Sequence, residues 1–221
     1  LAWICGNVVV WKPSEKTPLC AIACQNIFAE VARENGLPEG ISSLVIADHE
    51  IGDKLVNDKR ISLVSFTGST RVGRIVGQNV AKRFGKSILE LGGNAAVLIE
   101  PDTEISDALI DRIIGGAYGH AGQVCISVQR ILVHADIYSE LKKKLVLKLK
   151  KIQAADPALT TTLVGPMIKD KEALRLKKWV DKAVKKGAKV LSGNVLNGVL
   201  FEPTLLEGVD ENLEVYKDEV F

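Results

Sequence analysis

The sequence predicts an α/β protein in which a parallel sheet is followed by a second α/β domain. Short apolar runs of strand length alternate with longer segments whose apolar residues recur at helical spacing. This alternation implies parallel strands joined by right-handed helical crossovers. The pattern restarts after Gly92-Gly93, so we predict a hinge at this pair, between domains at 1–91 and 92–221.

The first predicted domain alternates strands with helices in the order of a Rossmann-like, dinucleotide-binding sheet. Val8-Val9-Val10-Trp11 is a continuous apolar run, which is typical of a buried parallel strand. The next helix is predicted from Pro18 to Asn35, because Gly36 and then Pro38 supply the usual stop signals. Further strands are expected at 43–47, 63–66 and 87–91, and helices at 50–57 and 69–81.

The second predicted domain continues the alternation. A strand is expected at 96–99, a helix at 106–116 and a strand at 130–133. Two long amphipathic helices at 138–152 and 171–186 and strands at 189–191 and near 200–201 complete it. Lysines alternate with leucines along these helices, which indicates solvated helix faces.

The composition is that of a soluble globular protein and excludes several classes of function. Hydrophobic residues make up 47% of the chain, charged residues 25%, and the net charge is +2. The chain therefore lacks the basic excess and interleaved aromatics of a nucleic-acid-binding protein. No apolar run approaches the length of a membrane span, and no signal peptide is visible.

The cysteines and histidines follow no disulfide or metal-ligand spacing, so no metal site is predicted. Reduced thiols in a cytoplasmic protein are the simplest interpretation. Cys20 and Cys24 lie four residues apart on the first predicted helix, and we expect both to be small residues of the core.

Two residues are candidates for covalent catalysis. Cys125 follows Gly122-Gln123, where little side-chain bulk blocks access, and Glu90 ends a predicted strand just before the glycine pair. A thiol nucleophile and a general base are the groups that form and then hydrolyse an acyl intermediate. Taken separately, a free cysteine is usually inert packing and a strand-end carboxylate is commonly just solvated. A dyad of Cys125 with His120 is disfavoured, because Glu90 already supplies a base.

Two further motifs carry phosphate- or ribose-binding chemistry. Thr67-Gly68-Ser69-Thr70 links a strand to a helix, where Ser69 can cap the helix, bind a phosphate, or do both. Its spacing is not that of the usual Rossmann glycine fingerprint. Lys12 and Glu15 follow the first strand and, taken alone, are a surface charge pair.

In order, the segments 12–15, 66–70, 89–93 and 122–125 resemble the motifs of the aldehyde dehydrogenase superfamily, and the resemblance runs from about Ile4 to Phe221. It implies the aldehyde dehydrogenase fold, with a parallel Rossmann-like cofactor sheet and an α/β catalytic domain. It also implies oxidation of a small aldehyde to a carboxylic acid. Cys125 would form the thiohemiacetal and thioester, and Glu90 would activate the hydrolytic water.

The resemblance also implies a dinucleotide site. Gly68 and Ser69 would lie at the phosphates, the segment with Lys12 and Glu15 at the adenosine ribose, and the segment with Glu219 and Phe221 at the nicotinamide side. The carboxylate of Glu15 favours NAD over NADP, because it binds ribose hydroxyls and repels a 2′-phosphate. The complete set of expected cofactor residues is Lys12, Ser14, Glu15, Gly68, Ser69, Leu91, Glu219 and Phe221.

The substrate and the final acceptor remain open at this stage. The first half is similar to the antiquitin-type branch, which oxidises α-aminoadipic semialdehyde. The loop around Val124 is similar to the lactaldehyde and non-phosphorylating glyceraldehyde-3-phosphate group instead. Alternatives are a CoA-acylating dehydrogenase of the same superfamily, which Glu90 disfavours, and a non-catalytic fragment that retains the fold.

The ends of the chain suggest an interior piece of a longer enzyme, because it begins at Leu1 without methionine and stops abruptly at Phe221. The family's second oxyanion donor, an asparagine, would then lie upstream of Leu1. We therefore expect the isolated piece to be inactive and the intact enzyme to be a homo-oligomer.

Overall fold

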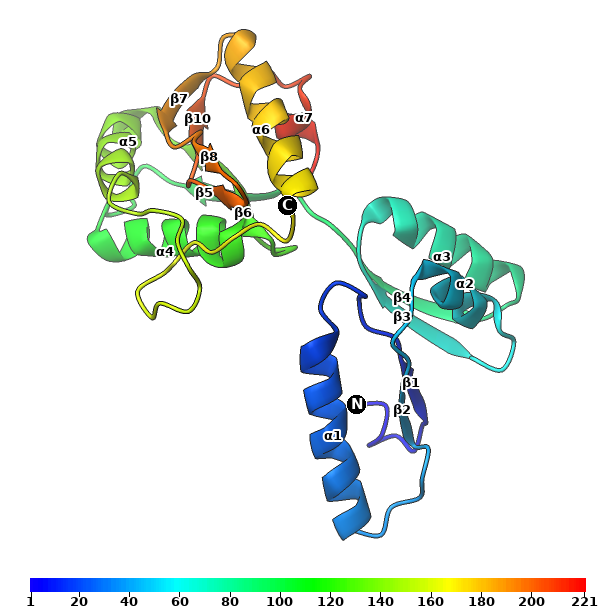
Figure 1. The fold of residues 1–221 in the computed structure, drawn as a ribbon. Coiled ribbons are helices and arrows are strands. Elements are labelled where there is room, and N and C mark those ends of the chain that lie inside the picture. Colours follow the sequence, from blue (N-terminus) through cyan, green and yellow to red (C-terminus); the bar gives the residue numbers. More distant parts are fainter. The chain divides into compact units, whose positions relative to one another are not determined.

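The computed structural model describes residues 1–221 and divides into two compact units, Leu1–Leu91 and Gly92–Phe221. The boundary falls at the Gly92-Gly93 pair. In Figure 1 the first unit begins in blue, and the second runs from green to red at the C-terminus.

The first unit alternates strands and helices as the sequence predicts. Its elements are β1 (Val9–Trp11), α1 (Pro18–Glu34), β2 (Ser42–Leu44), α2 (His49–Asn57), β3 (Leu63–Thr67), α3 (Thr70–Lys82) and β4 (Lys86–Glu90). β1 pairs with β2 and β3 pairs with β4, both in parallel, which confirms the predicted pairing. No hydrogen bonds join the two pairs, so they form separate two-stranded sheets.

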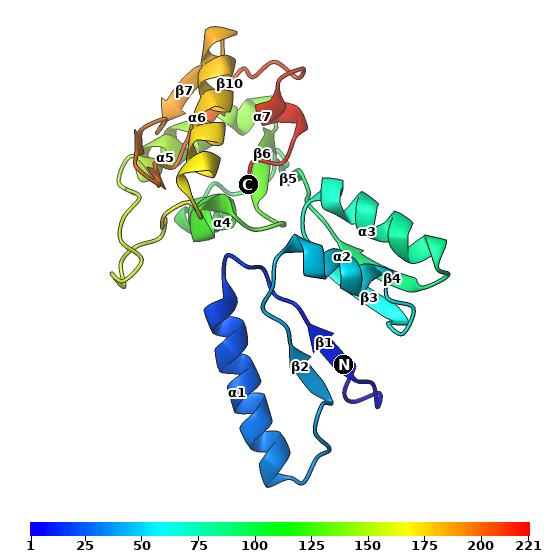
Figure 2. The same cartoon turned by 45° about the vertical axis from the view of Figure 1, so that its right-hand side comes forward.

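Local signals set the ends of the helices in this unit. α1 begins with Pro18 at its first position, and the chain leaves it through Gly36 at a φ of +62°. The Ser69 hydroxyl accepts a hydrogen bond from the Val72 N–H and caps α3, as one reading of its motif predicted. Figure 2 shows α2 and α3 side by side, and α3 buries Val76 and Val80.

Two predictions about burial in the first unit were wrong. Cys20 and Cys24 are exposed rather than in the core. α1 turns a different side toward β2, where the Gln25 amide and the Ser42 hydroxyl and carbonyl exchange hydrogen bonds, so residues 20 and 24 lie off that side. β1 was predicted to be buried, but Val10 is 48% exposed.

The second unit mixes parallel and antiparallel strands. Its elements are β5 (Ala95–Ile99), α4 (Asp107–Tyr118), the short 3₁₀ helix η1 (Gly119–Gly122), β6 (Val128–Val133), α5 (Ala135–Leu149), α6 (Asp170–Lys185), β7 (Lys189–Ser192), β8 (Leu196–Asn197), β9 (Leu200–Phe201), β10 (Leu205–Glu207) and α7 (Glu214–Lys217). β5 and β6 are parallel, whereas β7 pairs with β10 and β8 with β9 in antiparallel fashion. The predicted strands at 189–191 and near 200–201 are present as β7 and β9, but no helix separates β7 from β8, β9 and β10, so the alternation stops after β7.

The core of the second unit lies between β5, β6, α4 and α5. α5 inserts Leu141, Leu145 and Leu149 into a cluster with isoleucines of β5 and α4. Truncating such a leucine to alanine typically costs about 2–5 kcal/mol. Lys142 and Lys148 flank this buried face and pair with Glu207 and Asp111. Lys143, on the opposite side of α5, is exposed, in keeping with the predicted solvated face. This core fixes β6, the strand that follows the cysteine loop.

Two general findings bear on function. The structure contains no helix that combines the length and the apolarity needed to cross a membrane. It also contains no group of three or more His, Cys, Asp or Glu side chains arranged to hold a metal ion.

Candidate active site

The backbone before Cys125 has an uncommon conformation. His120 and Ala121 have φ values of 52° and 57°, and Gly122 follows at 70°, so three successive residues occupy the left-handed region. For residues with a Cβ this region costs roughly 1–2 kcal/mol each. Such backbone outliers cluster at functional sites, where surrounding contacts hold them in place.

Gln123 supplies those contacts. Its amide nitrogen donates to the carbonyls of His120 and Pro166, both at 3.3 Å, and its amide oxygen accepts from the Ile168 N–H at 2.9 Å. The glutamine of the Gly-Gln-x-Cys motif thus ties the loop to a second segment of the chain. Gln123 therefore holds the loop in place, and Cys125 supplies the thiol.

Cys125 occupies the first corner of a tight turn, which the hydrogen bond from the Ser127 N–H to the Val124 carbonyl closes at 2.9 Å. Its side chain is exposed. The backbone N–H of Cys125 donates to no other group of the chain. An accessible thiol beside a free N–H is the arrangement that attack on a carbonyl and stabilisation of the resulting oxyanion require.

The glycine pair lies between this turn and Glu219. The Gly93 N–H donates to a Glu219 carboxylate oxygen at 3.3 Å. A side chain at position 92 would overlap the same carboxylate, and a Cβ at position 93 would lie 3.1 Å from the Cys125 carbonyl oxygen. The second unit therefore brings the Cys125 loop and Glu219 together across Gly92-Gly93.

The segment that carries Glu219 is tied to β5 and β6. The Tyr216 carbonyl accepts hydrogen bonds from the Asn94 amide at 2.9 Å and from the Arg130 guanidinium. The guanidinium also stacks 4.0 Å from the centroid of the Tyr216 ring. At the end of the segment, Arg175 donates to the Phe221 carbonyl at 3.1 Å. These contacts restrict where Glu219 and Phe221 can lie.

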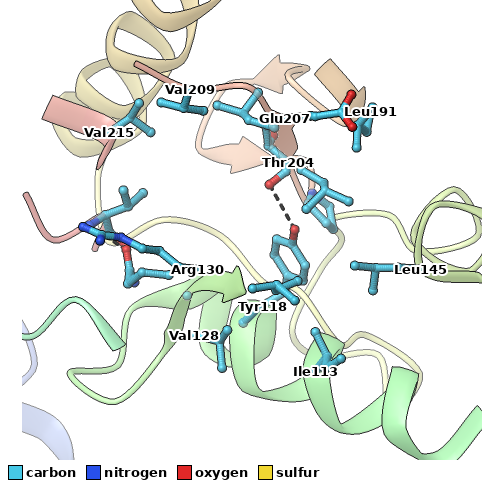
Figure 3. A pocket seen from close by; sticks show the side chains of 18 of the residues that line it. Ile113, Tyr118, Val128, Arg130, Leu145, Leu191, Thr204, Glu207, Val209 and Val215 are labelled. Atoms are coloured by element: carbon cyan, nitrogen blue, oxygen red, sulfur yellow. Dashed lines mark hydrogen bonds between the residues drawn. The ribbon is translucent and has the colours of Figure 1, made fainter. Parts of the chain in front are cut away.

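A cavity of about 520 Å³ lies next to this site in the second unit (Figure 3). Side chains from α4, α5, β6 and β10 line it, and most of them are apolar. The Tyr118 hydroxyl donates to the Thr204 carbonyl at 3.0 Å across it, and burial raises the pKa of Tyr118. Neither Cys125 nor Glu219 lines the cavity, so it is separate from the thiol.

In the first unit, the predicted phosphate motif leaves backbone N–H groups free at the start of α3. Ser69 caps only the Val72 N–H, so the N–H groups of Thr70 and Arg71 at the start of α3 have no intrahelical partner. A side chain at position 68 would lie 2.6 Å from the Phe66 ring. Small residues and free N–H groups at the start of a long helix fit a dinucleotide pyrophosphate.

The other cofactor candidates of this unit lie as follows. The Lys12 ammonium donates to the Pro13 and Ala47 carbonyls, both at 2.9 Å, so it does not form the surface charge pair with Glu15 that its motif alone suggested. Glu15 is exposed, and the Ser14 hydroxyl accepts from the Lys16 N–H at 3.3 Å. The Leu91 side chain lies against Gly73 of α3 and occupies the space that a Cβ at position 73 would need.

The two predicted catalytic residues belong to different units. Glu90 is the last residue of β4 in the first unit, opposite Thr67, with its side chain exposed and its carbonyl accepting from the Gly68 N–H at 3.0 Å. Cys125 lies in the second unit. Their cooperation therefore stays a prediction, whereas the arrangement of Cys125, the glycine pair and Glu219 is present within one unit.

Sequence reasoning missed two residues of this site. Asn94 and Gln129 hold the 216–220 segment through their side-chain amides, and the sequence motifs assigned neither of them a role. Gln129 and the neighbouring Arg130 could have been noticed as two polar residues in a strand that is otherwise apolar. The left-handed backbone at His120 and Ala121 has no sequence signal, because neither residue type favours positive φ as glycine does.

Comparison with known proteins shows the family of the chain. The aldehyde dehydrogenase family model matches residues 1–221. The 3-sulfolactaldehyde dehydrogenase of Priestia aryabhattai is 40% identical over 217 residues, which cover 98% of this chain and 44% of that protein. The chain therefore belongs to the aldehyde dehydrogenase family, and it spans less than half the length of this relative.

Solved structures show the same fold. Glyceraldehyde-3-phosphate dehydrogenase from Methanocaldococcus jannaschii, complexed with NADP, matches with a TM-score of 0.90 and 35% identity, covering 97% of this chain and 46% of that one. Betaine aldehyde dehydrogenase from Staphylococcus aureus, complexed with NAD⁺, matches with a TM-score of 0.88 and 31% identity, covering 96% and 43%. The aldehyde dehydrogenase fold is confirmed, and the family uses NAD or NADP.

Proposed function

We propose that the whole protein oxidises a small aldehyde to a carboxylic acid through a thiohemiacetal and a thioester on Cys125. The observation that carries the proposal is the turn at Cys125. There an exposed thiol and an unpartnered backbone N–H lie on a loop that Gln123 fastens, next to the glycine pair and Glu219. This combination has no evident use in packing.

Cys125 acts first in this scheme. Its thiolate attacks the carbonyl carbon of the aldehyde, and the negative charge that develops on the carbonyl oxygen is stabilised by the Cys125 N–H. Loss of one such donor typically lowers the rate on the order of 10²–10³-fold. NAD(P), when bound, supplies the hydride acceptor that takes the covalent adduct to the oxidation level of an acid.

Glu90 acts in the second half of the reaction. Its exposed carboxylate at the end of β4 takes a proton from water, which then attacks the thioester carbon and releases the carboxylic acid and the Cys125 thiol. The CoA-acylating alternative would transfer the acyl group to a second thiol instead and would need no such base.

The cofactor is held by residues of both units in this proposal. The start of α3 with Ser69 takes the pyrophosphate, Lys12, Ser14 and Glu15 take the adenosine end, and Glu219 takes the nicotinamide end together with Phe221. NAD is proposed over NADP because the Glu15 carboxylate repels a 2′-phosphate. Steady-state comparison of the two cofactors tests this, and a preference for NADP in kcat/KM would contradict it.

The substrate is proposed to be a small aldehyde without a carboxylate held next to the thiol. Val124 and Ile126 flank Cys125, and Ile126 is 78% exposed, so the immediate surroundings of the thiol are apolar. An apolar side chain cannot pair with a carboxylate as an arginine would. A panel of apolar and acidic aldehydes of equal chain length tests this, and faster turnover of the acidic members would contradict it.

The thiol itself gives the most direct test of the nucleophile. All four cysteines are exposed, so alkylation by iodoacetamide compares chemical reactivity among accessible thiols. We expect Cys125 to be alkylated at least ~10-fold faster than the three others, as reactive cysteines are. Peptide mapping after brief labelling measures this. Equal rates at Cys125 and Cys5 would contradict the proposal and favour a fold retained without catalysis.

A further inference from the structure

One side chain binds both backbone groups of the residue between Glu219 and Phe221. Gln129 is the second residue of β6, and its amide oxygen accepts from the Val220 N–H at 2.9 Å. Its amide nitrogen donates to the Val220 carbonyl at 3.3 Å. A glutamine amide carries a donor and an acceptor on neighbouring atoms, as a peptide group does, so it pairs with Val220 as a strand neighbour would.

This contact lies between two residues of the proposed cofactor site. The Glu219 carboxylate accepts from the Gly93 N–H, and the Phe221 carbonyl accepts from Arg175. Peptide bonds are planar and rigid, so a displacement of Val220 displaces the residues on both sides of it. Gln129 therefore controls the backbone from which both proposed cofactor-binding side chains project.

Gln129 is also joined closely to the nucleophile. The turn that presents Cys125 ends at Ser127, which is 3% exposed, and the chain enters β6 at the next residue. The same short stretch thus carries the thiol and the amide that holds Val220. A change in the register of β6 would move both together.

We propose that Gln129 is a positioning residue that keeps Glu219 and Phe221 in register with Cys125. The inference rests on the proposed function, because it gives these two residues the nicotinamide end of the cofactor. Gln129 touches neither cofactor nor substrate in this scheme. It acts through the Val220 backbone, so cofactor affinity and the rate of hydride transfer depend on the side-chain amide of Gln129.

Kinetics of Gln129→Met in the whole protein test the positioning role. Methionine has nearly the same length but forms neither hydrogen bond, and Gln153→Met makes the same exchange at an exposed position of the same unit. We expect the KM for NAD(P) to rise about tenfold in Gln129→Met, because two net hydrogen bonds are lost, while the KM for the aldehyde stays within about twofold. The deuterium isotope effect on kcat with a 1-deuterated aldehyde should also increase.

A purely structural role would give a different result. Partial unfolding lowers the active fraction, and hence the apparent kcat, without changing the KM for NAD(P) or the isotope effect. Gln129→Glu keeps an acceptor for the Val220 N–H but sets a carboxylate oxygen against the Val220 carbonyl, so its KM for NAD(P) should rise at least as much as in Gln129→Met. Parent values of KM and isotope effect in Gln129→Met would overturn the positioning role.

Amide hydrogen exchange tests the contact without cofactor or turnover. In the 221-residue chain, the Val220 amide should exchange at least ~10-fold faster in Gln129→Met than in the parent or in Gln153→Met, because one hydrogen bond protects it. Unchanged exchange in α4 would show that the variant is folded. Unchanged exchange at Val220 would show that the contact does not exist and would overturn the inference.

The two proposals fail in different ways. A parent protein that oxidises no aldehyde with NAD or NADP would overturn the proposed function, and with it the cofactor role of Gln129. A parent protein that does oxidise an aldehyde, with a Gln129→Met variant whose Val220 amide exchanges faster but whose kinetics are unchanged, would overturn only the role of Gln129.

Discussion

At Cys125, backbone geometry rather than a neighbouring side chain leaves the thiol exposed beside a free N–H. The left-handed residues His120 and Ala121 turn the chain sharply after α4, and the turn at Val124–Ser127 leaves the thiol and the Cys125 N–H free. Gln123 compensates for the strain through its three hydrogen bonds. Cys125 is therefore kept exposed by a loop that these hydrogen bonds hold in place.

Replacing Glu90 by glutamine should separate the two halves of the proposed reaction. Glu90→Gln keeps the size of the side chain but removes the base, so acylation should proceed and hydrolysis should slow on the order of 10²–10⁴-fold. A burst of NADH equal to the enzyme concentration, followed by little turnover, is the expected result in a stopped-flow experiment on the whole protein.

A matched control comes from another strand end. Glu100 is exposed and follows β5, so Glu100→Gln should leave burst and steady state unchanged. A Glu90→Gln variant with the parent's steady-state rate would show that another group activates the water.

Among single residues of the candidate site, the sequence brought out some and missed others. Cys125 and Glu90 could be proposed as candidates because each lies in a short contiguous motif with its own chemistry. Gln129 was not, since its role depends on Val220, far along the chain, and no local pattern records that contact. The exposure of Cys20 and Cys24 was mispredicted. Their spacing of four residues places both on one side of α1, but it does not indicate which side of the helix packs against the sheet.

At the scale of elements, long segments with clear signals were predicted best. Helices α1, α3 and α6 begin and end within about two residues of the predicted bounds, because prolines, glycines and capping residues mark their ends. The strands β8 and β10 and the helix α7 were missed. Each has only two to four residues, which is too short for a period of apolar residues to appear.

Tyr118 gives a prediction about the packing of α4 against the 204–207 segment. Its hydroxyl donates to the Thr204 carbonyl, so Tyr118→Phe should lower the free energy of unfolding by about 1 kcal/mol near pH 8. Tyr216→Phe is a control, because the Tyr216 hydroxyl forms no hydrogen bond within the chain. Urea unfolding of the parent and both variants measures the difference.

The same pair of variants should respond differently to alkaline pH. Burial raises the pKa of Tyr118 above its ordinary value of 10.0, so above about pH 10 the unfolded chain loses the Tyr118 proton while the folded chain keeps it. The parent therefore loses stability as pH rises through this range, and Tyr118→Phe lacks this loss. The stability difference should shrink from pH 9 to pH 11, and a constant difference would contradict the assignment.

At the scale of the whole molecule, the two units divide the proposed chemistry between them. The first unit carries Glu90 and the start of α3, which we propose to bind the pyrophosphate, and the second carries Cys125 with Glu219. The parallel α/β organisation of the first unit followed from the alternation of strands and helices. The antiparallel pairs of the second unit did not, because the direction of short strands depends on contacts that a local pattern does not contain.

Large apolar side chains are exposed in both units, which predicts self-association of the 221-residue chain. Ile27 and Val31 on α1 are 65% and 51% exposed, and Leu98 on β5 is 67% exposed. Apolar surface and open strand edges favour contacts between copies. Sedimentation velocity should show a mean mass that rises with protein concentration.

A pair of charge variants separates apolar association from charge effects. Ile27→Glu should lower the association, because it places a carboxylate on the exposed apolar side of α1. Asn26→Glu adds the same charge at a neighbouring exposed position of the same helix and should change little. A monomeric parent at every concentration would contradict the prediction.

The close approach of Glu219 to Gly92 links two distant positions of the sequence in evolution. Because the carboxylate occupies the space that a Cβ at position 92 would need, the two sites cannot vary independently. Among proteins that share this arrangement, a larger residue at the first position should occur only with a shorter or displaced side chain at the second. Gly92 and Glu219 would therefore be conserved together or replaced together.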